Sequence, residues 1–275
     1  MKKIILICTA LLLSLAGCSK ELHQNENETQ TEQQNTTEQT QQKSNKTAEN
    51  LSVQEGGTLS LSMRNAETLN PLLNQDASVD SVLKLIYMPL IKLDQNHKTS
   101  PCIAQSWSFD ESGTVLSLNL RNDIYWQNGS NLTADDVIYS FNTLSRVADA
   151  NAVYKDCMNY IRSYAKTSDY SLNITFQQNF SGNLYALLIP IIRSEYYGSN
   201  VAKSDKNMIP MGNGYFEFEN YMPAKEMILK KCASSFGTTA HIDTIRVNIS
   251  TDKDTDLYSF EQGLTDLLIM NTSDI

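Results

Sequence analysis

Two kinds of side chain in this sequence could take part in acid–base or metal chemistry. One is the adjacent pair Asp135 and Asp136 in "NLTADDVIYSFNTL", which could form an acid/base couple. The pair follows Thr133 at the expected start of a helix, and we favour the interpretation that both carboxylates complement that helix N-terminus. The other kind is the set of three histidines, His23, His97 and His241. Their wide separation is not the spacing of a metal or catalytic site, so the sequence predicts a protein that is not an enzyme and needs no cofactor.

Cys18 has the clearest local context of any reactive residue. It follows two lysines and the stretch "IILICTALLLSLAG", which has the charged start, short apolar core and small residues of a secretory signal. This stretch is too short to remain as a spanning helix. The segment Leu15–Cys18 resembles the lipobox of bacterial lipoproteins, which implies a signal peptide over residues 1–17 and a lipid on Cys18. We therefore expect a protein anchored by lipid on the outer face of the cell membrane; the alternative is an ordinary secretory signal, which would give a free secreted protein.

The three remaining cysteines are Cys102, Cys157 and Cys232. They are far apart in sequence, and one of them has no possible partner within a monomer. This pattern does not describe a small fold held by disulfides. We expect mostly buried free thiols, with one disulfide as the alternative.

Residues 18–55 contain mostly Gln, Asn, Thr and Glu and too few apolar residues to offset the entropy of ordering. They predict a disordered tether; a Gln/Asn-rich aggregating segment is the alternative, which the interspersed charges oppose. After removal of the signal, 20 basic side chains remain against 31 acidic ones, a net charge near −11. Nucleic acid is therefore an unsuitable partner.

From Gly56 onward, segments with the periods of strands and helices alternate. Strands are expected over 58–64, in a hairpin over 106–121 that turns at 110–113, and over 170–176, 214–221, 226–231, 243–250 and 265–270. Helices are expected over 78–90, 131–144, 152–164, 183–192 and 250–263. The last of these should have a Ser or Thr cap, Leu257 and Phe260 facing inward, and Gly263 as its stop. This order predicts an α/β fold with a mixed sheet.

Five segments, taken in order, resemble the extracellular solute-binding proteins of family 5, the oligopeptide- and dipeptide-binding lipoproteins of ABC importers. The segments are "GGTLSLSMRNAETLNPLL", "IYMPLIKLDQNHKTSPCIAQSW", "GTVLSLNLRNDIYWQNGSNLTADDVIYSF", "PMGNGYFEFENY" and "DTDLYSFEQGLTDLLI". The resemblance implies a two-lobed periplasmic-binding-protein-like fold, with residues 56–94 and 205–275 in the first lobe and 95–204 as an inserted small subdomain. Because family chains are much longer, it also implies that the second lobe is absent from these residues.

The resemblance suggests where a ligand would bind. Asn65, Ala66 and Glu67, just after the first expected strand, match family positions that offer backbone and polar contacts to a bound peptide. Gly212, Asn213 and Gly214 could let backbone approach the cleft closely, although a plain turn is the simpler interpretation. The aromatic residues Trp107, Tyr125 and Trp126 could flank a ligand, but we expect them to pack the small subdomain.

The resemblance also implies a function. It is the capture of oligo- or dipeptides outside the membrane for the permease subunits of an ABC importer, and a metal chelate or sugar as ligand remains open. The alternative from another class is a truncated or repurposed surface lipoprotein that serves as an interaction or signalling module. A truncated product that binds nothing is a third possibility.

Overall fold

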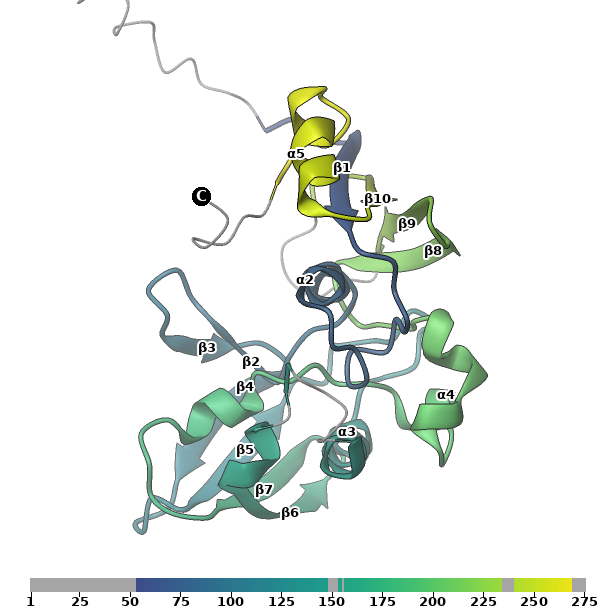
Figure 1. Ribbon diagram of the computed structural model, residues 1–275. Coiled ribbons are helices and arrows are strands. Elements are labelled where there is room, and N and C mark those ends of the chain that lie inside the picture. Colours follow the sequence, from purple (N-terminus) through teal and green to yellow (C-terminus); the bar gives the residue numbers. More distant parts are fainter. Residues whose placement is uncertain (1–52, 148–152, 155, 234–239, 269–275) are drawn as a thin grey trace, which may run out of the picture. The chain divides into compact units, whose positions relative to one another are not determined.

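The computed structural model describes residues 53–147, 153–154, 156–233 and 240–268 (Figure 1). The expected signal segment, Cys18 and nearly all of the polar tether lie outside these residues. No helix in the described ranges is long and apolar enough to cross a membrane.

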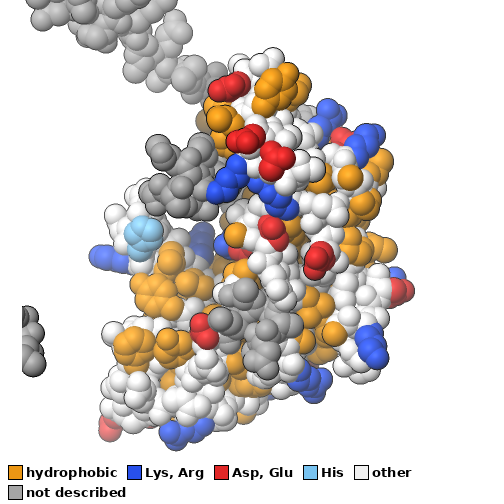
Figure 2. All heavy atoms as spheres, viewed as in Figure 1, with side chains coloured by type: hydrophobic (Ala, Val, Ile, Leu, Met, Phe, Trp, Pro, Cys, Tyr) orange, Lys and Arg blue, Asp and Glu red, His pale blue; other side chains and the backbone are white. Residues whose placement is uncertain are grey.

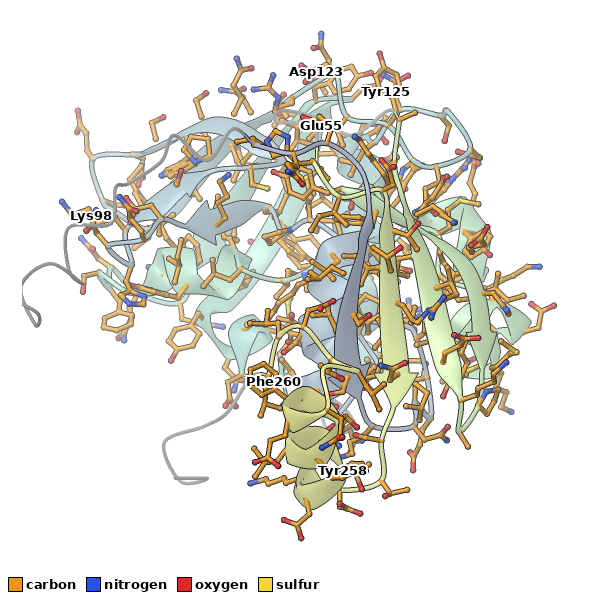
Figure 3. The ribbon with its side chains drawn as sticks, turned by 90° about the horizontal axis from the view of Figure 1, so that it is seen from above. Glu55, Lys98, Asp123, Tyr125, Tyr258 and Phe260 are labelled. Carbon is orange, nitrogen blue, oxygen red and sulfur yellow. The ribbon has the colours of Figure 1, made fainter. Side chains whose placement is uncertain are left out.

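In the described part of the chain, four strands form the first sheet. They are β1 (Thr58–Met63), β10 (Thr244–Ile249), β9 (Glu226–Lys231) and β8 (Phe216–Met222), in that spatial order. β1 runs parallel to β10, and the other pairs are antiparallel, so the predicted mixed sheet and α/β class are confirmed. β1 forms one edge of this sheet, beside α5 (Figure 3).

The helix α2 (Ala77–Ile86) packs against this sheet. Asp76 caps it, because its carboxylate accepts hydrogen bonds from the N–H groups of Ser78 and Val79. The helix then buries an apolar stripe with the expected spacing: Val79, Val82, Leu83 and Ile86. The predicted helix over 78–90 thus ends at Ile86, before Pro89.

The second sheet, again counting described residues, has four antiparallel strands. They are β4 (Ala104–Phe109), β5 (Val115–Leu120), β7 (Ser171–Phe176) and β6 (Ile161–Ser168), in that order. The β4–β5 hairpin forms as predicted, since the Asp110 carboxylate accepts hydrogen bonds from the N–H groups of Thr114 and Val115. A separate small hairpin joins β2 (Ile91–Leu93) to β3 (Thr99–Pro101).

The helix α3 (Ala134–Val147) covers the second sheet and buries Val137, Phe141 and Leu144, as predicted. Shorter helical elements occupy the connections. They are η1 (Cys157–Tyr160), η2 (Asn183–Leu187), α4 (Ser194–Tyr197), η3 (Val201–Lys203) and η4 (Asp205–Met208), with α5 (Lys253–Glu261) after β10.

The buried side chains of the described residues fall into two cores. One holds residues from Met88 to Ile191, around the second sheet and α3. The other holds Met63 to Tyr87 together with Ile192 to Val247, around the first sheet and α2. We call the part that contains the second sheet and α3 the small subdomain, and the part that contains the first sheet and α2 the main subdomain. Two chain crossings join them where Pro89 and Pro190 form a β-bridge.

Two predicted helices are wrong over most of their length. Over 152–164, the described residues form only η1, and β6 begins at Ile161, because pairing with β7 outweighs local helical spacing. Over 183–192, only η2 forms, and it ends at Leu187. Pro190 disfavours helical conformation at the residue before it, so the helix does not continue to Ile192.

The prediction for the last helix is also partly wrong. Its cap is Asp252, rather than a Ser or Thr, with the carboxylate accepting from the N–H of Thr255. Leu257 and Phe260 are 42% and 44% exposed, so they do not face inward. Gly263 ends the helix with a φ of 68°, as predicted.

The expected strand over 265–270 is absent from its described part, residues 265–268. Asp266 nevertheless binds the β1 edge. It donates its N–H to the Ser60 carbonyl at 2.8 Å and accepts the Ser60 N–H at 2.7 Å.

Candidate functional site

The loop after β1 leaves the first sheet at the ends of the strands where ligands bind in related architectures. β1 and β10 are parallel, so their carboxyl ends lie together, and the β8–β9 turn lies at the same end of the sheet. Crevices at the carboxyl ends of parallel strands are the usual ligand sites of open α/β sheets. The predicted site residues Asn65, Ala66 and Glu67 begin this loop.

Two of these residues are hydrogen-bonded to the end of β8 and to the β8–β9 turn. The side-chain oxygen of Asn65 accepts hydrogen bonds from the Tyr221 hydroxyl at 3.0 Å and from the Ala224 N–H at 2.9 Å. The latter bond supports Ala224 in the left-handed region, at a φ of 58°. Ala66 is buried and donates its N–H to the Tyr221 hydroxyl at 2.9 Å, whereas Glu67 is exposed. The loop is therefore held in place while Glu67 projects into solvent.

A cleft of about 420 Å³ opens beside this loop. Its lining comes from the end of β1, the start of α2, α5 and the segment after α5: Leu61, Ser62, Met63, Arg64, Asp76, Ala77, Ser78, Ser81, Val82, Lys253, Asp254, Asp256, Leu257, Leu267 and Leu268. The volume falls within the range of about 300–1,000 Å³ that is usual for small-molecule sites. Apolar and charged groups thus share one concave surface.

Arg64 is the central charge of the cleft. Its guanidinium pairs with the Asp256 carboxylate at 2.8 Å and also donates to the Ser250 hydroxyl. Its backbone N–H donates to the Ser78 hydroxyl at 2.9 Å. The second carboxylate oxygen of Asp256 is buried and has no hydrogen-bond partner among the described residues.

Two capping carboxylates near the cleft are held ionised. Burial raises the pKa of Asp76, but hydrogen bonds from Ser78 and Val79 outweigh it and the net pKa is lowered. The pKa of Asp252 falls to about 2, chiefly because the Thr255 N–H donates to it. The charge of Arg64 lowers both pKa values further.

The structure places Gly212, Asn213 and Gly214 away from this loop. All three are buried at the C-terminal end of α2, and the N–H groups of Asn213 and Gly214 donate to the Ile86 carbonyl. The Asn213 side-chain oxygen accepts from the Met88 N–H at 2.9 Å. α2 has ten residues and is about 15 Å long, so the two predicted groups lie near its opposite ends. Their role as ligand contacts remains a prediction.

Both glycines stand where a side chain would collide with the end of α2. A Cβ atom at Gly212 would lie 2.0 Å from the Ile86 carbonyl oxygen, and one at Gly214 would lie 2.7 Å from two backbone oxygens. These glycines therefore allow the chain to pack directly on the end of α2.

Asp136 has a structural role, which agrees with our interpretation of the pair. Its carboxylate accepts from the indole N–H of Trp126, from the backbone N–H of Thr133 and from Ser194. Asp135 is exposed and pairs with Lys166 at 2.7 Å.

The aromatic residues near the hairpin mainly pack the small subdomain. Trp126 is fully buried and Trp107 packs against that core, although Tyr125 is 39% exposed. None of the three lines the cleft beside Arg64.

The three cysteines outside the expected signal and lipid site are thiols rather than members of a disulfide, as predicted. Cys102 and Cys232 are buried, and Cys157 is half-buried. Within the described residues, no group of three or more His, Cys, Asp or Glu side chains is placed to hold a metal.

Sequence reasoning missed Arg64 and Asp256 as members of the cleft. The position of Arg64 directly after the first strand was a usable signal. Asp256 had none, because its contact with Arg64 joins residues 192 positions apart.

Several known proteins resemble this chain. Residues 98–275 match the family model described as bacterial extracellular solute-binding proteins, family 5 Middle. The nickel-binding periplasmic protein of Escherichia coli (strain K12) is 24% identical over 192 residues, which cover 68% of this chain and 36% of that protein. Oligopeptide-binding protein AppA of Bacillus subtilis (strain 168) is 23% identical over 221 residues, which cover 76% of this chain and 40% of that protein.

The fold matches solved structures as well. The ABC transporter-associated periplasmic binding protein DppA from Helicobacter pylori, in complex with peptide STSA, superposes with a TM-score of 0.67 at 22% identity. The superposition covers 77% of this chain and 46% of DppA. The chain thus spans less than half the length of these relatives. Because the family model matches more than half of its 275 residues, the chain belongs to the bacterial extracellular solute-binding proteins of family 5.

Proposed function

We propose that this chain takes part in capturing oligo- or dipeptides outside the cytoplasm for an ABC importer. The observation that carries the proposal is the family match over residues 98–275. Two relatives support a peptide as ligand, since AppA is an oligopeptide-binding protein and DppA was solved with a peptide. A nickel-binding relative at similar identity keeps the alternative of a metal chelate in the test.

On this proposal the ligand lies along the loop that starts with Asn65, at the carboxyl ends of β1 and β10. Extended peptides gain affinity when their N–H and C=O groups pair with protein backbone. The hydrogen bonds of Ala66 to Tyr221 of β8, and of Asn65 to the β8–β9 turn, hold that backbone in one conformation. Preorganised backbone lowers the entropy that binding costs. The exposed carboxylate of Glu67 would attract a cationic group of the ligand.

We also propose that Cys18 carries the lipid that holds the protein at the membrane. The support is the segment Leu15–Cys18 after an apolar signal. A Cys18→Ala variant should leave the membrane fraction of the cell and lose incorporation of labelled palmitate. Equal membrane retention and equal palmitate labelling of the variant and of the unchanged protein would contradict lipidation at Cys18.

Peptide capture can be tested by calorimetric titration of the purified chain with mixed di-, tri- and tetrapeptides and, separately, with nickel–histidine. We expect heat from the peptides, and a weaker affinity in Glu67→Ala. The matched control is Glu111→Ala, an exposed carboxylate in the β4–β5 turn. A folded chain that binds no peptide would overturn the proposal, and binding of nickel–histidine alone would replace the peptide by a metal chelate.

A further inference from the structure

A groove of about 670 Å³ lies on the small subdomain, apart from the cleft beside Arg64. Residues of η1 and η2, with the turn before η2, line it. Figure 2 shows hydrophobic side chains gathered on this face of the small subdomain, beside the β2–β3 hairpin. Nothing in the proposed peptide capture uses this groove.

Three aromatic rings are the main feature of the groove. Tyr160, Phe180 and Tyr185 are 41%, 45% and 50% exposed, although aromatic side chains usually bury most of their surface. The rings of Tyr160 and Phe180 are nearly parallel, with an interplanar angle of 13° and centroids 6.1 Å apart. Exposed apolar surface of this kind, gathered in a concavity, marks a binding site more often than isolated exposed residues do.

Local geometry permits this arrangement of the rings. Gly182 has no side chain, and an added Cβ would lie 2.3 Å from the Phe180 ring. Glycine there lets the ring fold back over the turn. The Tyr185 hydroxyl donates a hydrogen bond to the His97 carbonyl at 3.4 Å, which connects η2 to the β2–β3 hairpin.

The described side chains that line the groove carry a net negative charge. Among the described residues that line it, Asp156 carries the single charge, and no lysine or arginine is present. Burial, and then the neighbouring Asp156, raise the pKa of the Cys157 thiol to about 11, so the thiol is neutral at pH 7. Aromatic faces add the negative end of their quadrupole.

We propose that this groove binds a quaternary ammonium group. Such a cation is attracted to aromatic faces and to a carboxylate, and it has no N–H that would need acceptors. Besides the Asp156 carboxylate and the Ser181 hydroxyl, the lining supplies side-chain oxygens only at the ring hydroxyls of Tyr160 and Tyr185, and the Tyr185 hydroxyl already donates to the His97 carbonyl. A sugar, or a primary ammonium, would leave more of its hydrogen-bonding groups without partners.

The test is a calorimetric titration of the full chain with choline chloride and with its uncharged isostere 3,3-dimethylbutan-1-ol. Choline should bind with saturation, and the alcohol should bind at least about tenfold more weakly. Asp156→Asn and Phe180→Leu should each weaken choline binding by about tenfold. The control is Tyr258→Leu, which removes an exposed ring from α5 (Figure 3) and should leave choline binding unchanged.

Several outcomes would overturn the proposal. They are no saturable choline binding, equal affinity for the alcohol, or an equal loss of affinity in Tyr258→Leu. Binding to lipid vesicles distinguishes the two possible sources of the cation, a lipid headgroup and a soluble ligand. Binding to phosphatidylcholine but not phosphatidylglycerol vesicles would support a lipid headgroup, whereas binding of free choline alone would support a soluble ligand. Because peptide capture uses the loop after β1, either proposal can fail while the other stands.

Discussion

Substitution of Gly212 by alanine should destabilise the protein strongly. The added methyl group would lie 2.0 Å from the Ile86 carbonyl oxygen and 2.5 Å from an Ile86 side-chain carbon. The carbonyl oxygen belongs to the last residue of α2, and that helix is anchored in the main core. The clash therefore cannot be relieved by rotating a side chain.

The expected cost follows from two effects. Overpacking a filled site costs about 1–3 kcal/mol. Moving the chain away from α2 would also weaken the hydrogen bonds that Asn213 and Gly214 donate to Ile86, at about 0.5–1.5 kcal/mol each. We expect a total loss of about 2–6 kcal/mol in the free energy of unfolding. At about 2–4 °C per kcal/mol for a domain of this size, the Tm should fall by about 4–24 °C.

The measurement is thermal and urea unfolding followed by circular dichroism, with Gly182→Ala as the matched control. The control also places a methyl group in a close contact, but against the Phe180 ring, which is 45% exposed and can turn away. We expect its free energy of unfolding to change by less than about 1 kcal/mol. Equal stability of Gly212→Ala and Gly182→Ala would refute the packing of the glycine segment on α2.

Three further predictions concern polar and thiol groups. Asp136→Ala removes the acceptor for Trp126 and two backbone N–H groups and should cost more than about 3 kcal/mol in urea unfolding, whereas exposed Asp135→Ala should cost far less. The folded-state pKa of Asp252, about 2, lies below its ordinary value of 3.8, so its stabilisation is complete above pH 4 and is lost as the pH falls toward 2; Asp252→Asn, which can still cap α5, should flatten the Tm profile over that range. Alkylation by iodoacetamide at pH 8 should be slow at Cys157, whose pKa is raised to about 11, and should become fast in urea; fast labelling of the folded protein would contradict its half-buried position.

Sequence patterns predicted the elements whose signals are local. α2 and α3 have both a capping carboxylate and a complete apolar stripe, and the β4–β5 hairpin has its turn residues. β5 and β7 alternate buried and more exposed side chains along their whole length, as their sequence pattern predicts. These features come from side chains within one turn or one strand of each other.

The errors arise where distant residues decide the structure. β6 contains spacing that suits a helix, but pairing with β7 provides backbone hydrogen bonds between the two strands. For α5, the apolar residues Leu257 and Phe260 suggested a buried face that the described chain does not cover. The partner of Arg64 in the cleft could not be predicted, because no local pattern links it to Asp256.

The separate cores of the two subdomains make the proposed sites independently testable. The loop with Asn65 depends on the main core, whereas the aromatic groove depends on the small subdomain. The two parts meet at several places: the Pro89–Pro190 bridge, the N–H of Ser194, which donates to Asp136 of α3, the N–H of Gln127, which donates to the Gly212 carbonyl, and the Tyr154 hydroxyl, which donates to Asp80 at 2.9 Å. A mild change at this junction should therefore lower the stability of the protein without altering the chemistry of either site. A loss of peptide or choline binding that exceeds the unfolded fraction would instead show that the junction positions that site.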